Sequence, residues 1–196
     1  MDVGLRFKEI EHKFIVSPTF DVEAMTSRVD ALGPSRRVDL RVRDRYFITE
    51  AGRAGGFILR HRHDRELHEL TLKTVTRDAE VRDEVNLKLR AVDQDATVDA
   101  FVRAQRPIWQ GVLWKDIRVW HFPDCEVVYY RATTDTRSID CVEFEAVHQT
   151  SLEAALAVMQ RFEAATGFAE ATRTPASLVE LMWPEVFADL GWRTTP

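Results

Sequence analysis

The chain has 196 residues, of which 45% are hydrophobic and 30% are charged, a mixture typical of a folded soluble protein and not of a disordered one. This length is enough to bury one core, so we expect residues 1–196 to form a single domain. The formal net charge of −5, from 27 Lys and Arg against 32 Asp and Glu, argues against non-specific nucleic-acid binding.

The sequence shows no targeting signal and no cysteine-based zinc motif. Its first 14 residues contain no apolar core of signal-peptide length, and no stretch approaches the roughly 18 apolar residues of a membrane span. Cys125 and Cys141 belong to no set with zinc-ligand spacing. We therefore expect a cytoplasmic protein with reduced cysteines and no membrane partner.

Strand-like alternation of polar and apolar residues dominates the chain and is interrupted by four helical patterns. The predicted strands are Arg6–Val16, Asp39–Thr49, Gly56–Asp64, His68–Thr76, Glu80–Leu89, Lys115–Phe122, Glu126–Thr133 and Ile139–Gln149. The predicted helices are Thr19–Leu32, Asp95–Gln105, Ser151–Thr166 and Pro175–Leu190. Eight strands joined mainly by short turns indicate an α+β protein built on an antiparallel barrel, with the helices packed outside it.

Charged residues share one face of most predicted strands, because side chains two positions apart point the same way. In the first strand Glu9, Glu11 and Lys13 share a face, opposite Ile10 and Phe14. The other charged residues with apolar neighbours on the opposite face are Arg60, Arg62, Lys73, Arg82, Glu84, Arg118, Glu143 and Glu145. A solvent-exposed face would explain any one strand. The four amphipathic helices, however, need the apolar faces, which directs the charged faces inward.

A charged interior cannot be a dry core, because an isolated buried charge costs several kcal/mol. We therefore predict a water-filled tunnel that binds a ligand. Clustered carboxylates suit Mg²⁺ or Mn²⁺, and Arg and Lys side chains suit phosphate oxygens. Both sets in one cavity predict a metal–polyphosphate complex as the ligand.

The ordered motifs resemble the CYTH superfamily, the triphosphate tunnel metalloenzymes. The resemblance starts at the Glu9–Lys13 segment, which matches the family's ExExK signature, and continues nearly to the C-terminus. The later matching segments are 44–47 (DRYF), 59–62 (LRHR), 70–73 (LTLK), 82–84 (RDE), 143–145 (EFE) and 175–181 (PASLVEL).

The resemblance implies an eight-stranded tunnel, a divalent metal and a triphosphate substrate. Carried over by position, it implies metal binding and catalysis by Glu9, Glu11, Glu143 and Glu145, with Lys13 also catalytic. It implies phosphate binding by Lys13, Arg60, Arg62, Lys73, Arg82 and Arg118, with Glu84 orienting a base or a second metal.

One departure concerns an Asp that family members carry near the end of the penultimate strand. That stretch here, residues 127–131, has no acid, and spacing does not show whether Asp135 or Asp140 replaces it. Three functions therefore stay open: hydrolysis of inorganic triphosphate, which we favour; an adenylyl cyclase or a phosphatase of an organic triphosphate such as thiamine triphosphate; and a non-catalytic nucleotide or polyphosphate binder. A homodimer also stays open.

Several other residues have a structural interpretation. His61, His63 and His68 suggest a transition-metal site as one interpretation. His61 and His63 alternate with the arginines, however, which predicts an outer face and favours a packing or surface role. Lys115 is expected at the end of a strand near the tunnel opening. The sequence does not decide whether it contacts phosphate. Trp120 shares a face with Arg118, so the same pattern leaves it either in the core or in the tunnel.

Overall fold

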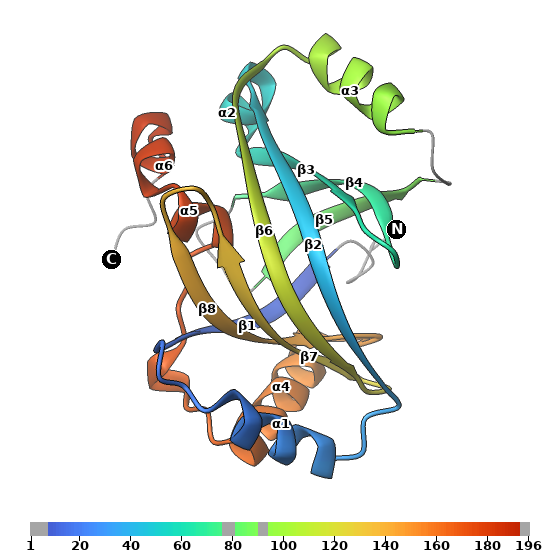
Figure 1. Ribbon diagram of the computed structural model, residues 1–196, viewed down its shortest axis with the longest axis vertical. Coiled ribbons are helices and arrows are strands. Elements are labelled where there is room, and N and C mark those ends of the chain that lie inside the picture. Colours follow the sequence, from blue (N-terminus) through green and yellow to red (C-terminus); the bar gives the residue numbers. More distant parts are fainter. Residues whose placement is uncertain (1–7, 76–80, 90–93, 193–196) are drawn as a thin grey trace.

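A computed structural model describes residues 8–75, 81–89 and 94–192, and eight antiparallel strands close into a barrel within them (Figure 1). Around the barrel the strand order is β1-β5-β4-β3-β2-β6-β7-β8, and β8 pairs with β1 to close it. The strands are β1 (Lys8–Val16), β2 (Arg36–Thr49), β3 (Phe57–His63), β4 (His68–Thr74), β5 (Val81–Lys88), β6 (Pro107–His121), β7 (Cys125–Thr133) and β8 (Ser138–Ala146). The predicted antiparallel barrel is confirmed.

In the part of the chain that the structure describes, six α-helices surround the barrel. They are α1 (Val22–Ala31), α2 (Glu50–Gly55), α3 (Asp95–Ala104), α4 (Leu152–Thr166), α5 (Leu178–Met182) and α6 (Pro184–Leu190), and a short 3-10 turn spans Glu170–Thr172. In Figure 1, α1 and α4 lie together below the barrel, and α3 lies at its upper right. No described helix is both long enough and apolar enough to span a bilayer.

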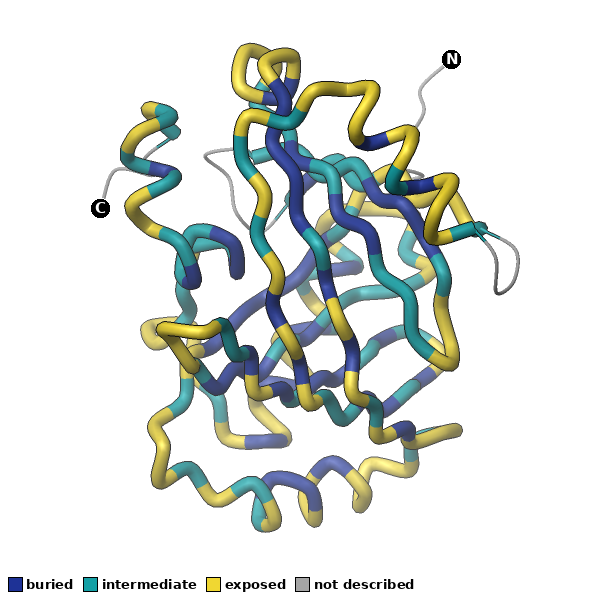
Figure 2. Tube along the Cα trace, turned by 45° about the horizontal axis from the view of Figure 1, so that its top comes forward, coloured by how far each residue is buried: buried dark blue, intermediate teal, exposed yellow. Residues whose placement is uncertain are grey.

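The apolar faces of the strands pack under these helices. Ile10, Phe14 and Phe144 are buried with Met25 of α1 and Met159 of α4. A smaller cluster packs α3 against β2 and β4. Buried or half-buried residues alternate with exposed ones over residues 107–116 of β6, as Figure 2 shows. This is the pattern of a strand with one covered face and one face toward solvent.

The predicted C-terminal helix Pro175–Leu190 is wrong in one respect, because two short helices occupy that segment. Trp183 separates them, with φ −138° and ψ 62°, and Pro184 is the first residue of α6. Proline lacks the N–H of a helical hydrogen bond and disfavours helical geometry in the residue before it, so the helix ends there. Helix α2 was not predicted. It begins at Thr49, whose side chain accepts a hydrogen bond from the Gly52 N–H, and ends at Gly56.

The aromatic contact that anchors α5 and α6 to the barrel depends on a glycine in β6. Trp109 and Trp183 meet edge to face, with ring centroids 5.1 Å apart. A Cβ atom at Gly111 would lie 2.5 Å from the Trp109 ring and 2.8 Å from the Trp183 ring. Only glycine therefore fits beneath this pair without displacing it.

We expect Gly111→Ala to lower the free energy of unfolding by about 1–3 kcal/mol, because the added methyl group overpacks the Trp109–Trp183 contact. Urea denaturation followed by tryptophan fluorescence measures this. The control is Val112→Ala at the neighbouring, 40% exposed side chain, which should change stability by less than about 0.5 kcal/mol. Equal effects of the two substitutions would contradict the close approach at Gly111.

Candidate functional site

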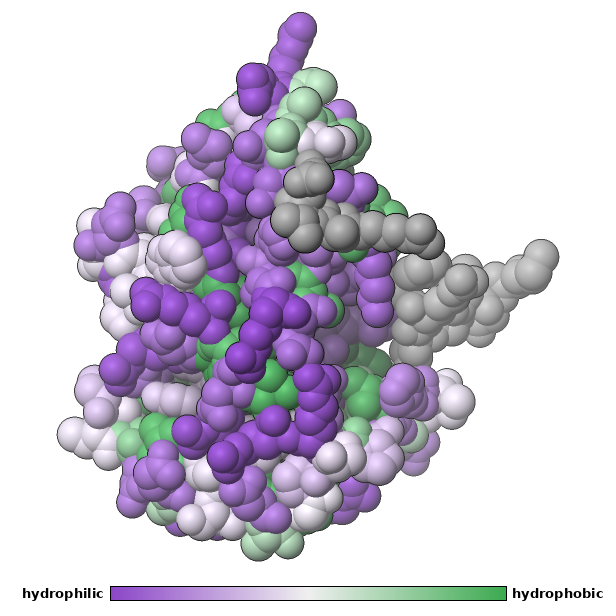
Figure 3. Space-filling view, turned by 45° about the vertical axis from the view of Figure 1, so that its right-hand side comes forward, coloured by the Kyte–Doolittle hydropathy of each residue, from purple (hydrophilic) through white to green (hydrophobic). Residues whose placement is uncertain are grey.

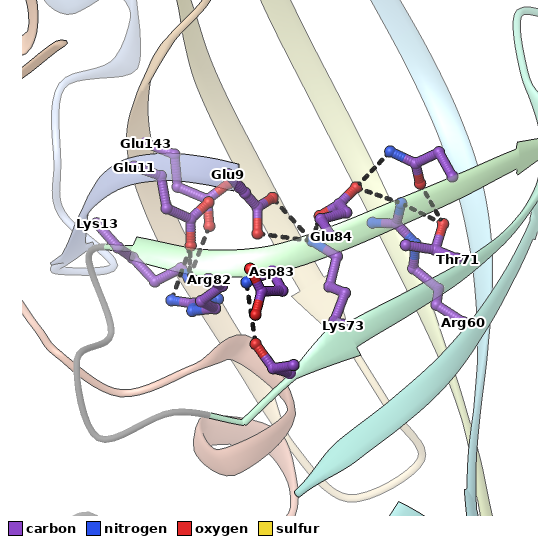
Figure 4. A network of polar contacts seen from close by, with 12 residues as sticks. Glu9, Glu11, Lys13, Arg60, Thr71, Lys73, Arg82, Asp83, Glu84 and Glu143 are labelled. Carbon is purple, nitrogen blue, oxygen red and sulfur yellow. Dashed lines mark hydrogen bonds and ion pairs between the residues drawn. The ribbon is translucent and has the colours of Figure 1, made fainter. Parts of the chain in front are cut away.

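The barrel encloses a cavity of about 400 Å³ that is lined by many of the charged residues expected to face inward. This volume is near the lower end of the range for small-molecule sites. The sequence-predicted residues that line it are Glu9, Glu11, Lys13, Arg60, Arg62, Lys73, Arg82, Glu143 and Glu145. Glu84 lies beside them, in contact with Lys73 (Figure 4).

Strand β1 supplies the first three of these residues by simple alternation. Glu9, Glu11 and Lys13 point into the cavity, while Ile10 and Phe14 are buried in the outer core. His12 also points outward, to Glu163 of α4. Strand β1 pairs with β5 up to Ile10 and with β8 from Glu11 onward, so the ExExK segment lies where three strands meet.

Ion pairs link the acids and bases across this junction (Figure 4). The Lys73 Nζ atom lies 2.8 Å from Glu9 and 2.5 Å from Glu84. The Lys13 Nζ atom lies 2.9 Å from Glu11 and 3.0 Å from Glu143. Burial by itself would lower the pKa of Lys73, but Glu9 and Glu84 outweigh it and raise that pKa above its usual value. Both lysines therefore keep their charge inside the barrel.

Glu145 is the exception to this pairing. Among the described residues, no hydrogen-bond donor and no cation lies within bonding distance of its carboxylate. Burial raises the pKa of Glu145 well above its usual range, and the neighbouring Glu9, Glu126 and Glu11 raise it further. Without a cation beside it, Glu145 therefore favours its protonated form. Carboxylate oxygens are the ligands that hard divalent cations prefer.

A second network occupies the wall formed by β2, β3 and β6. Asp44 is fully buried and accepts two hydrogen bonds from Arg62, both of 2.7 Å. The Lys115 Nζ atom lies 3.5 Å from Asp44. Burial lowers the pKa of Lys115 to about 8, and Arg62 and Arg60 lower it as well, while Asp44 opposes them. Lys115 therefore lines the cavity as a cation that loses its proton readily.

The sequence placed no role on Asp44 and left Lys115 undecided. Alternation along β2 would have found Asp44, because it shares a face with Val42 and Tyr46, which both line the cavity. Its partners could not be foreseen, since β6 lies far from β2 in sequence and pairs with it only in the folded barrel.

The prediction that Arg118 binds phosphate is wrong, because its side chain lies outside the tunnel. It donates a 2.8 Å hydrogen bond to Asp39 and a 2.7 Å hydrogen bond to Thr26 of α1. On β6 the apolar residues Ile117 and Val119 face the cavity instead. Trp120, on the same side as Arg118, is buried in the core under α1 and α4. The rule that charged faces point inward fails on this strand because the cavity wall here is apolar.

Neither Asp135 nor Asp140 supplies the acid that the sequence lacks near the end of β7. Asp140 forms two 2.7 Å hydrogen bonds with Arg131, and Asp135 is exposed. The acid that β7 does contribute is Glu126, which lines the cavity and pairs directly with Glu145 in the β7–β8 ladder. Tyr130 donates a 2.6 Å hydrogen bond to Glu143.

Comparison with known proteins tests the fold. No protein-family model and no curated protein matches the chain. Among solved structures, the PH1012 protein from Pyrococcus horikoshii OT3 is similar with a TM-score of 0.72 and 19% identity, covering 88% of this chain and 98% of that one. A candidate adenylate cyclase from Bacillus halodurans is similar with a TM-score of 0.57 and 17% identity, covering 90% and 98%.

HpAC1 from Hippeastrum, a candidate adenylyl cyclase with a dominant triphosphatase activity, is similar with a TM-score of 0.52 and 14% identity, covering 91% of this chain and 95% of that one. The chain shares its eight-stranded barrel fold with these proteins. A chain of the Schizosaccharomyces pombe Mediator head module also shares the fold, with a TM-score of 0.54 and 11% identity over 83% and 96% of the two chains. The tunnel fold therefore does not fix the function, which must be argued from the site.

Folding raises the pKa of Glu145 and lowers that of Glu11. We therefore expect substitution by Gln to change the free energy of unfolding in opposite directions at the two positions. A carboxylate whose pKa is raised on folding loses its contribution to stability as the pH rises. Without added metal, Glu145→Gln should therefore stabilise the protein by about 1 kcal/mol or more at pH 9, and by little near pH 4.5. Urea denaturation at both pH values, with a chelator present, measures this.

Glu11→Gln is the matched variant. Burial would raise the pKa of Glu11, but Lys13 outweighs it, together with Arg82 and Lys73, and holds that pKa below its usual value. The stability that Glu11 contributes is thus present above about pH 4.5 and is lost below it. We expect Glu11→Gln to destabilise the protein by about 1–3 kcal/mol at pH 7. Shifts of the same sign in both variants would show that Glu145 is paired.

Proposed function

We propose that this protein hydrolyses triphosphates inside the tunnel with the help of Mg²⁺ or Mn²⁺. The observation that carries the proposal is Glu145, a carboxylate without a cationic partner among the described residues, set beside ion-paired acids and bases in one closed cavity. A divalent ion would supply the missing positive charge. Its ligands would be drawn from Glu9, Glu11, Glu143 and Glu145.

The basic residues of the cavity would bind the phosphates. Lys13 and Lys73 each lie between two carboxylates, so they are held in place and remain charged. Arg82 lies 3.0 Å from Glu11 and joins the same network. Phosphate oxygens can take the place of these carboxylates as hydrogen-bond acceptors, since arginine and lysine bind both groups in similar ways.

Arg60 and Arg62 would bind the substrate from the facing wall. Arg60 donates to Glu69 at 2.9 Å and to Thr71 at 3.1 Å, and Asp44 fixes Arg62. These contacts fix both guanidinium groups before substrate arrives, which lowers the entropy lost on binding. The structure favours a positioning role for Glu84, because it contacts Lys73 at 2.5 Å and Arg60 at 3.7 Å.

Phosphoryl transfer to water needs little covalent chemistry from the protein, so positioning and electrostatic stabilisation would supply most of the rate. A bound divalent ion polarises phosphate oxygens and lowers the pKa of an attacking water. Lys13, Lys73 and Arg82 would stabilise the negative charge that develops on the leaving group. No side chain of the cavity is required as a nucleophile.

A second candidate substrate, an organic triphosphate, is favoured by the apolar part of the cavity wall. Inward-facing residues of β2 and β6 form it, namely Val38, Leu40, Val42, Ile117 and Val119. In Figure 3, hydrophobic groups are visible between the charged side chains in the middle of the face shown. Inorganic triphosphate has no apolar part that could use such a wall, whereas a nucleoside or thiamine group could pack against it.

Purified protein with Mg²⁺ or Mn²⁺ should release orthophosphate from inorganic triphosphate. We expect Lys73→Gln and Glu143→Gln each to lower kcat/KM by about 100-fold or more, since each removes a charge from the cavity. The matched control is Arg118→Gln, which removes a positive charge outside the tunnel and should leave kcat/KM unchanged. Normal turnover by Lys73→Gln, with a native melting curve, would contradict the proposed site.

The two candidate substrates are separated by comparing inorganic triphosphate with ATP and thiamine triphosphate. If the apolar wall binds an organic group, Val119→Asn should lower kcat/KM at least about tenfold for the organic substrate and leave that for inorganic triphosphate unchanged. If Val119→Asn lowers kcat/KM equally for all three substrates, the apolar wall does not support an organic substrate. Scoring ATP products as cyclic nucleotide or orthophosphate separates a cyclase from a hydrolase.

A further inference from the structure

A cluster of three histidines and one aspartate lies on the outer wall of the barrel, away from the tunnel. His61 and His63 are on β3, His68 is on β4, and Asp95 is the first residue of α3. The proposed hydrolysis uses none of them. From the sequence alone, a transition-metal site at the three histidines was the less favoured interpretation, and a packing or surface role for His61 and His63 was preferred.

The sheet register explains why the imidazoles meet. His63 pairs directly with His68 in the β3–β4 ladder, and their rings stack with centroids 3.9 Å apart. His61 lies two residues before His63 on β3 and therefore shares its face. It is the diagonal neighbour of His68 across the two strands. Helix α3 packs over this face and brings Asp95 to the cluster.

The distances between the potential ligand atoms match those around a bound metal ion. The Nε2 atoms of His61 and His68 are 3.1 Å apart. The Asp95 Oδ1 atom lies 3.6 Å from the first and 3.5 Å from the second. A tetrahedral ion with ligands at 2.0–2.2 Å holds them about 3.3–3.6 Å apart. Among the described residues, this is the one group of three such side chains with ligand atoms within 4.8 Å of one another.

We propose that His61, His68 and Asp95 bind one transition-metal ion of the Zn²⁺ type on the outside of the barrel. Two imidazoles and one carboxylate are ligands that Zn²⁺ and Co²⁺ accept readily, whereas Mg²⁺ prefers oxygen ligands alone. This ion is therefore distinct in chemistry and in place from the one proposed for the tunnel. The fourth coordination position stays open to water or another ligand.

His63 is the positioning residue of this site. Its Nδ1 atom lies 3.1 Å from both carboxylate oxygens of Asp95, so its ring fixes the orientation of that ligand. Hydrogen bonds of this kind to a metal ligand are worth about 10-fold to 100-fold in affinity. The nearby Arg45 would repel a cation, but Asp99 lies 2.6 Å from its guanidinium and offsets that charge.

Two features suit the site to binding rather than to packing alone. The side chain of His61 is almost fully buried and that of His68 nearly so, whereas Asp95 is 53% exposed. An ion can thus enter from the side of Asp95 and reach the imidazoles. The Nδ1 atoms of both histidines lack a hydrogen-bond partner among the described residues, so each ring can carry its proton there and direct the Nε2 lone pair to the ion.

The test is a titration of the full, untagged chain with Co²⁺, whose four-coordinate complexes absorb strongly in the visible range. We expect one Co²⁺ per chain with that absorption, displaced by Zn²⁺ and not by Mg²⁺. His68→Gln and Asp95→Asn should abolish the absorption, and His63→Gln should weaken binding about 10-fold to 100-fold. The control His148→Asn changes an exposed histidine elsewhere and should have no effect.

A tunnel variant distinguishes this site from the proposed catalytic one. Glu145→Gln should leave the Co²⁺ spectrum unchanged, because Glu145 lies in the tunnel and the cluster lies outside it. The proposal is overturned if Co²⁺ gives no such absorption. It is also overturned if Glu145→Gln removes the absorption while His68→Gln and Asp95→Asn, checked for native circular dichroism, retain it.

Discussion

The closure of the sheet is the constraint on which the rest of this structure depends. In a closed barrel each strand has one face toward the lumen and one toward the outside, and side chains alternate between them. The helices cover outward apolar residues such as Ile10 and Phe144. Charged residues on the inner faces cannot leave the lumen, so they must be paired or bound by a ligand. The site is a consequence of that geometry.

Not every charged side chain inside the lumen has a partner of opposite charge among the described residues. A purely structural network of ion pairs would leave none unpaired. Lys13 and Lys73 each contact two carboxylates, whereas the charged groups that shift the pKa of Glu145 most are other acids, which raise it. Such an imbalance costs stability in the absence of ligand. A fold retains that cost where a bound cation and a polyanion remove it together, which is the pattern of a functional site.

The sequence predicted the barrel and most of the charged residues that line its cavity, because alternation is a local property. On β1, β3, β4, β5 and β8 the charged face was also the inner face, so the residues predicted there lie in or beside the cavity. The same rule failed for Arg118, since polarity alone does not tell which side of β6 faces inward. Contacts between strands distant in the chain, such as Asp44 with Lys115, depend on the strand order and had no local pattern.

The alternation on β3 also places arginines on the inner face of the strand and histidines on its outer face. Arg60 and Arg62 point into the tunnel, while His61 and His63 point to the outer wall beneath α3. The inner pair suits phosphate. On the outer wall, His61 suits a transition metal as a ligand and His63 positions the ligand Asp95. A ligand on one face would restrict the same strand backbone that holds the other face. Strand β3 is therefore the element that the two proposed sites share.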